Sequence, residues 1–96
     1  MIGKHASHKD LHSEFKDILN LLQSRGEQSF RTPRGVSFVA SAARTKRGQD
    51  PDTPFIQVSS LNGVESARIY SCCWGHTTNC YGAHIGGYSA GLDKLT

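Results

Sequence analysis

The sequence predicts a single α+β domain: an N-terminal amphipathic helix, an antiparallel sheet of three or four strands and a short C-terminal helix. Apolar residues recur at helical spacing over residues 8–25 and then alternate with polar residues from residue 36. An Asn-Gly pair between two further alternating runs adds a hairpin. A chain of 96 residues has room for one modest core in two layers, and residues 1–7 are expected to be flexible.

The first helix is predicted over residues 8–25. Ser7 is a plausible N-cap, and Gly26 directly after Arg25 is a typical helix end. The apolar residues at i, i+4, i+7, i+8 and i+11 form one stripe, which should contact the sheet. They are Leu11, Phe15, Ile18, Leu19 and Leu22.

Two strands are predicted before a loop that is poor in apolar residues. Residues 36–43 alternate with period two and favour a strand, and residues 28–32 favour a short edge strand before Pro33. Residues 44–54 contain a glycine and two prolines and are predicted to be loop.

The Asn62-Gly63 pair favours a two-residue type I′ turn, in which both residues have a positive φ. This turn fixes the register of the hairpin, and residues of similar kind then face each other on both sides. The pairs on the predicted buried side are Val58–Ala67 and Ile56–Ile69, and those on the other side are Gln57–Arg68 and Phe55–Tyr70.

Continued alternation places Cys73 on the buried side, and Cys72 and Trp74 on the side of Tyr70. Phe55, Tyr70 and Trp74 would then form an exposed aromatic face, unless a helix covers it. Exposed aromatic patches usually mark interfaces, so this face predicts a homodimer.

A closing helix of about three turns is predicted from apolar residues at helical spacing near the end of the sequence. Its glycines would allow close approach of a strand or of a second subunit. The apolar positions are Ile85, Tyr88, Leu92 and Leu95, and the glycines are Gly86, Gly87 and Gly91.

Charge and cysteine content limit the function classes. The net charge of +3 permits nucleic-acid contact but indicates it only weakly. The three cysteines are an odd number, and no apolar run is long enough for a signal peptide or a membrane span. These observations predict a cytoplasmic protein with reduced thiols, no membrane association, no cofactor and no bound metal.

Residues 71–88 contain all three cysteines, two of the five histidines and the single tryptophan. Such side chains supply most nucleophiles, bases and soft metal ligands in proteins, so this segment is the first place to look for a site. The predicted ligand-binding residues are Tyr70, Trp74, His76, Asn79 and Cys80.

Two chemical alternatives use the same segment. Cys73, His76, Cys80 and His84 are four possible zinc ligands, although their spacing is unusual for a zinc site. A small hydrolase would use Cys80 as nucleophile, His76 or His84 as base and Asn79 or Asp93 to orient the base. In the first helix, His8 and His12 have metal-binding spacing but lack a third ligand. No catalytic residue is assigned.

Nucleic-acid binding is a further alternative. A cationic patch would form if the predicted loop folded over one face of the sheet, and Tyr70 and Trp74 would then be available to stack on bases. The basic residues are Arg31, Arg34, Arg44, Lys46 and Arg47.

The run Trp74-Gly75-x-x-Thr78-Asn79-Cys80-x-Gly82-x-x-Ile85-Gly86-x-Tyr88, followed by Leu92-Asp93, resembles a signature of small uncharacterised proteins encoded on mobile integron gene cassettes. The resemblance covers residues 74–93. It implies a stand-alone α+β domain that is often a homo-oligomer, and it assigns no catalytic residue. The sequence as a whole favours a homodimeric binding or interaction module, with a small molecule or a protein as partner, over an enzyme.

Overall fold

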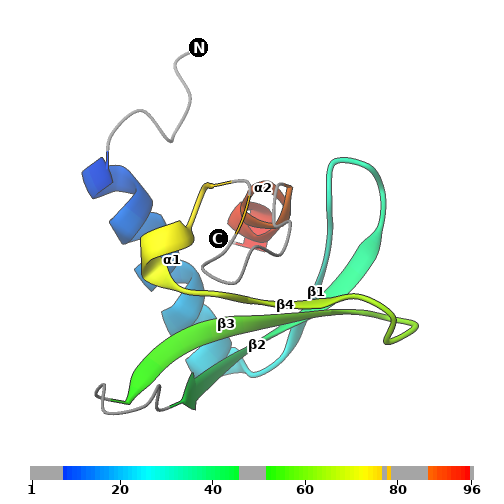
Figure 1. Ribbon diagram of the computed structural model, residues 1–96, viewed down its shortest axis with the longest axis horizontal. Helices are drawn as coiled ribbons and strands as arrows, with labels where there is room; N and C mark the ends of the chain where they lie inside the picture. The colour runs from blue at the N-terminus through cyan, green and yellow to red at the C-terminus, as the bar shows by residue number, and fades with distance from the viewer. Residues whose placement is uncertain (1–7, 46–51, 77, 79–86, 96) are drawn as a thin grey trace.

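The computed structural model describes residues 8–45, 52–76, 78 and 87–95, and the side chains of residues 8–12 and 45 are not described. The predicted α+β fold is confirmed, and residues 1–7 lie outside the described part (Figure 1). The elements are α1 (His8–Arg25), β1 (Gln28–Arg31), β2 (Ser37–Thr45), β3 (Thr53–Ser60), β4 (Ser66–Ile69), the 3₁₀ helix η1 (Ser71–Cys73), α2 (Tyr88–Leu92) and the 3₁₀ helix η2 (Asp93–Leu95).

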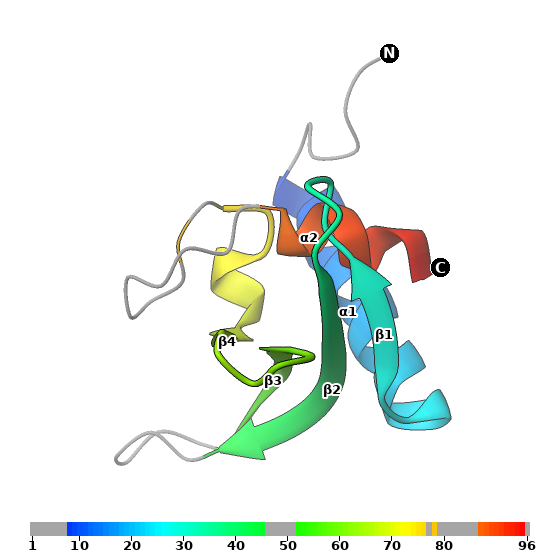
Figure 2. The same ribbon diagram turned by 90° about the vertical axis from the view of Figure 1, so that its right-hand side faces the viewer.

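The four strands form one antiparallel sheet in the order β1-β2-β3-β4. Both α1 and α2 lie on the same side of this sheet, and no described helix covers the other side (Figures 1 and 2). No helix among residues 8–45, 52–76 and 87–95 is long and apolar enough to cross a membrane. The fold is thus two layers, with the core between the helices and one face of the sheet.

The apolar stripe of α1 is buried as predicted, so α1 packs on the sheet through one face. Phe15, Ile18 and Leu22 are each at most 3% exposed. The side chain of Leu11 lies outside the described part. The sheet residues that complete the core under the helices are Phe30, Phe38, Ala40, Ile56, Val58, Ala67 and Ile69.

The β3–β4 register is confirmed, but the predicted turn is wrong. Ile56 pairs with Ile69 and Val58 with Ala67, and these residues are buried. Asn62 does not have the positive φ that a type I′ turn requires, whereas Gly63 has a φ of +76°. The connection is therefore a four-residue loop over residues 61–64.

The side chain of Asn62 explains the longer loop. Its Oδ1 accepts hydrogen bonds from the Val64 amide at 3.0 Å and from the Ser60 hydroxyl at 2.7 Å. The Gly63 amide donates to the Ser60 carbonyl at 2.9 Å, and the Ser60 amide donates to the Glu65 carbonyl at 2.8 Å. Because Leu61 and Val64 do not pair, the loop has four residues instead of two, and the register of the strands is unchanged.

The predicted loop over residues 44–54 is shorter than expected, because β2 and β3 continue into it. Arg44 pairs with Pro54 and Thr45 with Thr53. Because β4 pairs with β3 only from Ile56 onward, Pro54 has a described neighbouring strand on one side only, and such an edge position is where proline is tolerated in a sheet. β2 therefore begins one residue later and ends two residues later than the strand predicted over residues 36–43.

The C-terminal helical segment approaches β1 closely. A Cβ atom built on Gly91 would lie 2.4 Å from the carbonyl oxygen of Arg31 and 2.8 Å from the ring of Phe30. The expectation that a glycine allows a strand to approach is confirmed at this position. The described helix is shorter than the predicted three turns, since α2 begins at Tyr88 and η2 ends at Leu95, and Ile85 and Gly86 lie outside the described part.

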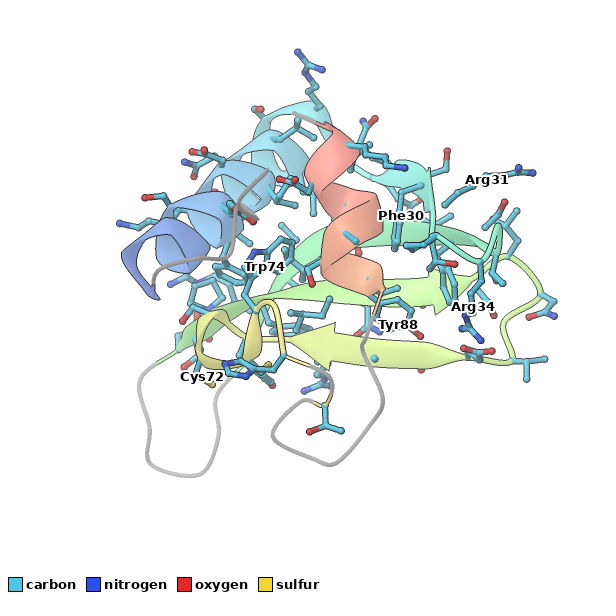
Figure 3. All side chains as sticks on the ribbon, turned by 90° about the horizontal axis from the view of Figure 1, so that it is seen from above. Phe30, Arg31, Arg34, Cys72, Trp74 and Tyr88 are labelled. Atoms are coloured by element: carbon cyan, nitrogen blue, oxygen red, sulfur yellow. The ribbon has the colours of Figure 1, made fainter. Side chains whose placement is uncertain are left out.

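Tyr88 joins α2 to β2 and to the connection between β3 and β4 (Figure 3). Its ring packs against Phe38 with the ring centroids 4.9 Å apart, and its hydroxyl donates to Oε1 of Glu65 at 3.4 Å. Burial and the negative charge and hydrogen bond of Glu65 raise the pKa of Tyr88 above its usual value of 10.0, with a smaller opposing effect from Arg34.

Candidate functional site

The predicted aromatic face is not exposed. Phe55 is 3% exposed, Tyr70 2% and Trp74 1%. The rings of Phe55 and Tyr70 lie 5.4 Å apart, and the guanidinium of Arg68 lies 4.8 Å from the centroid of the Phe55 ring. The interpretation of this face as an exposed interface is therefore wrong.

Period-two alternation fails here because the strand ends at Ile69 and η1 follows. The Cys73 amide donates to the Tyr70 carbonyl at 3.0 Å, and this hydrogen bond closes the turn. After this turn Trp74 lies between α1 and η1 (Figure 3). Its ring meets Phe15 edge-on at 5.8 Å, and its Nε1 donates to Oε1 of Glu14 at 3.3 Å.

The Cys73 thiol is engaged by the backbone of the same turn. Its Sγ accepts a hydrogen bond from the Tyr70 amide and donates one to the Tyr70 carbonyl, both at 3.3 Å. Cys73 is buried as predicted, whereas Cys72 is exposed. These contacts give Cys73 a structural role in holding η1.

The structure describes three of the five predicted ligand-binding residues, and they differ in exposure. Tyr70 and Trp74 are in the core, and His76 is exposed. Asn79 and Cys80 lie outside the described residues, so their role stays a prediction. Trp74 nevertheless contributes indirectly to the groove described below, since it packs against Phe15.

The zinc and hydrolase alternatives depend on residues outside the described part. Cys80 and His84 are not described, and neither are the side chains of His8 and His12. No group of three or more possible metal ligands occurs in residues 8–45, 52–76, 78 and 87–95. Of the remaining hydrolase residues, Asp93 is half-buried in η2.

The predicted basic patch is only partly described. Arg31 and Arg34 are exposed, and Arg44 forms an ion pair with Asp52 at 3.2 Å. Lys46 and Arg47 lie outside the described residues. Because Tyr70 and Trp74 are buried, they are not available to stack on bases beside these arginines.

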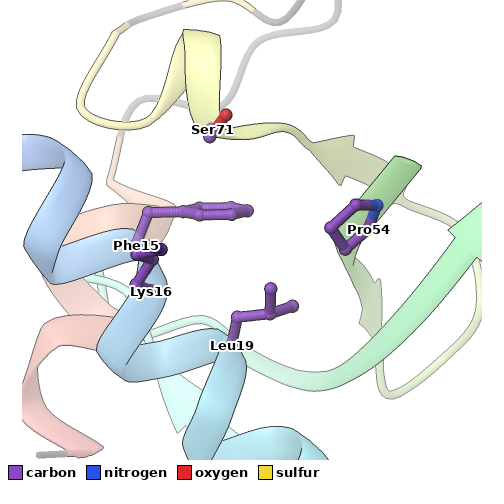
Figure 4. A pocket seen from close by; sticks show the side chains of 5 residues that line it. All are labelled: Phe15, Lys16, Leu19, Pro54 and Ser71. Carbon is purple, nitrogen blue, oxygen red and sulfur yellow. The ribbon is translucent and has the colours of Figure 1, made fainter. Parts of the chain in front are cut away.

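A groove that the sequence did not predict lies where α1, β3 and η1 meet (Figure 4). Its volume is about 380 Å³. Phe15, Lys16 and Leu19 of α1 form one side, with Pro54 of β3 opposite and Ser71 of η1 above. The walls are therefore mainly apolar, and one cation lies among them.

The groove follows from the way the sheet ends. β4 pairs with β3 as far as Ile56, and the chain then turns into η1 at Ser71. The first residues of β3 extend past β4, which leaves space beside Pro54 that no neighbouring strand fills. No local sequence pattern signals this space, because three separate segments form it.

Comparison with known protein families, with curated proteins and with solved structures finds no match to this chain. The resemblance of residues 74–93 to integron cassette proteins therefore stays a prediction.

Proposed function

We propose that the protein is a binding module for a small molecule, and that the ligand occupies the groove between α1, β3 and η1. The observation that carries this proposal is an apolar groove of about 380 Å³ beside a filled core. Small-molecule sites are typically mainly apolar and measure roughly 300–1,000 Å³. The groove falls at the small end of that range, which favours a ligand with few atoms.

A binding module is also what the sequence predicts, but the groove lies between α1, β3 and η1 rather than within the Cys/His segment. Ser71 brings the groove to the edge of the Cys/His segment, and Phe15 links the groove to Trp74. A binding role is better supported than nucleic-acid recognition, because the aromatic rings are buried. It is also better supported than a Cys73-based reaction, because the backbone engages that thiol.

The single tryptophan provides a direct test. Phe15 lines the groove and touches Trp74, so a molecule bound against Phe15 should change the fluorescence of Trp74. We expect 1-octanol to produce a saturable fluorescence change, and to shift the amide resonances of Phe15, Leu19 and Ser71 in two-dimensional NMR spectra. A small apolar ligand should bind with a Kd of about 10 μM to 1 mM.

A filled groove should not bind the probe. The variant Leu19→Phe places a larger ring among the groove walls, and we expect it to weaken 1-octanol binding at least tenfold. Gln23→Phe is the matched control, because Gln23 is exposed on the same helix and does not line the groove. If both variants bind 1-octanol as the native protein does, or if the native protein shows no saturable shift, the proposal is wrong.

Self-association is a separate proposal that the burial of the aromatic residues modifies. Phe55, Tyr70 and Trp74 are buried within one chain, so a homodimer would have to use another surface. Sedimentation equilibrium at micromolar concentration measures the mass directly. A mass near the 10.5 kDa of the chain would contradict a homodimer.

A further inference from the structure

The groove has a charge preference, and we infer that its ligand is a small amphipathic anion, of which a carboxylate with a short apolar body is the simplest example. This inference rests on the proposed function and specifies its ligand class. The residue that carries it is Lys16, the only charged residue among the five described residues that line the groove.

Lys16 has no carboxylate neighbour along its own helix. The residues three and four positions away are Ser13, His12, Leu19 and Asn20. Asp17 is adjacent in sequence, but neighbouring positions on a helix do not face each other. Within the described part of the chain Lys16 forms no ion pair, so its ammonium group is available to a ligand.

None of the five described residues that line the groove is acidic, and two acidic residues close to them in sequence have partners. The Glu14 carboxylate accepts the hydrogen bond from Trp74 Nε1 at 3.3 Å. Asp52, close in sequence to Pro54, is paired with Arg44. A bound cation would therefore find no available carboxylate on the described walls of the groove, whereas a bound anion would meet one available ammonium group.

The shape of the groove fits a ligand with two different ends. Phe15, Leu19 and Pro54 offer apolar surface to the body of the ligand. A lysine stem lies along apolar surface while its ammonium group stays near water, so Lys16 can hold a carboxylate at the mouth of the groove. The body enters the groove, and the charged head stays partly solvated.

Three probes of matched length separate apolar binding from charge recognition: octanoate, 1-octanol and octylammonium. Followed by Trp74 fluorescence and NMR at low salt, octanoate should bind about three- to tenfold more tightly than 1-octanol, and octylammonium should bind most weakly. The advantage of octanoate should shrink as salt is added, because the ammonium group is exposed to solvent.

The variant Lys16→Gln should remove the advantage of octanoate, so that octanoate and 1-octanol bind to this variant with Kd values within about twofold of each other. Lys94→Gln is the matched control, because it removes the same charge from an exposed position in η2 that does not line the groove. Equal binding of the three probes to the native protein would overturn the charge preference and leave the binding module intact. Absence of binding by all three would overturn both.

Discussion

The two helices cover the same face of the sheet in opposite ways. At the β1 end, α2 approaches so closely that even a methyl group on Gly91 would collide with the Arg31 carbonyl. At the β3 end, a groove of about 380 Å³ lies between α1 and Pro54. The difference teaches that burial fraction alone does not describe packing, since Phe15 at the groove is 3% exposed and Phe30 at the tight contact is 6% exposed.

The largest expected effect on stability is at the contact between α1 and the core, next to the groove. Phe15 is 3% exposed and packs on Trp74, so Phe15→Ala should lower the free energy of unfolding by about 3–5 kcal/mol in denaturant melts. Gln23→Ala, at an exposed position of α1, should cost less than about 0.5 kcal/mol. A loss of unfolding free energy below about 1 kcal/mol for Phe15→Ala would mean that Phe15 is not tightly packed in the core.

The second prediction tests the tight contact. Alanine is favoured over glycine in helices by about 1 kcal/mol, so Gly91→Ala would stabilise the protein if helix propensity alone determined its stability. The clash with the Arg31 carbonyl predicts the opposite sign, a loss of about 1–3 kcal/mol. The control is Ala90→Gly, at the exposed neighbouring position, which should cost about 1 kcal/mol by propensity alone. A stabilised Gly91→Ala variant would show that α2 can move away from β1.

The same two contacts show what the sequence could predict. The stripe of α1 is regular over three turns, so its buried residues follow from periodicity, and Phe15, Ile18 and Leu22 are buried as expected. The β3–β4 register follows from the agreement of both faces of the hairpin, and it survives the wrong turn type because only the Leu61–Val64 pair opens. The glycines near the end of the sequence predict a close approach without deciding between a strand and a second subunit, and the structure shows the approach of β1 at Gly91.

Local sequence patterns do not predict the position of Trp74 or the presence of the groove. Alternation assigns Trp74 to a face only as long as the strand continues, and the strand ends where hydrogen bonds between Tyr70 and Cys73 form a 3₁₀ turn. The groove depends on how far β3 extends past β4 and on where η1 lies above Phe15. Both facts concern the relative placement of segments that are distant in sequence.

A third and smaller effect concerns the attachment of α2. The raised pKa of Tyr88 means that the folded protein keeps this proton at a pH where the unfolded chain has lost it. Stability from this group is therefore present below about pH 10 and declines as the pH rises further. Tyr88→Phe should cost about 1 kcal/mol at pH 7, the usual contribution of one hydrogen bond.

The pH dependence separates this hydrogen bond from simple packing. The difference in unfolding free energy between the native protein and Tyr88→Phe should narrow as the pH rises above about 10, measured by denaturant melts on both sides of that pH. Glu65→Gln keeps the length of the side chain at the other end of the hydrogen bond and removes its charge, so it should weaken the same pH dependence. A difference near zero at every pH would show that Tyr88 acts only through its ring contacts, which Tyr88→Phe keeps.

The smallest expected effect is at the groove, and it completes the contrast with Gly91. Overpacking a filled core typically costs about 1–3 kcal/mol, because neighbouring atoms must move. Leu19 lines the open groove, so the larger ring of Leu19→Phe can extend into empty space without displacing Pro54 or Ser71. We therefore expect Leu19→Phe to change the free energy of unfolding by less than about 0.5 kcal/mol, even as it reduces binding of 1-octanol. A single methyl group at Gly91 would then cost more than the larger ring at position 19, although both residues are buried on helices that cover the same face of the sheet. If Leu19→Phe instead loses more than about 1 kcal/mol, the groove closes in solution, and neither a ligand nor the added ring has room there.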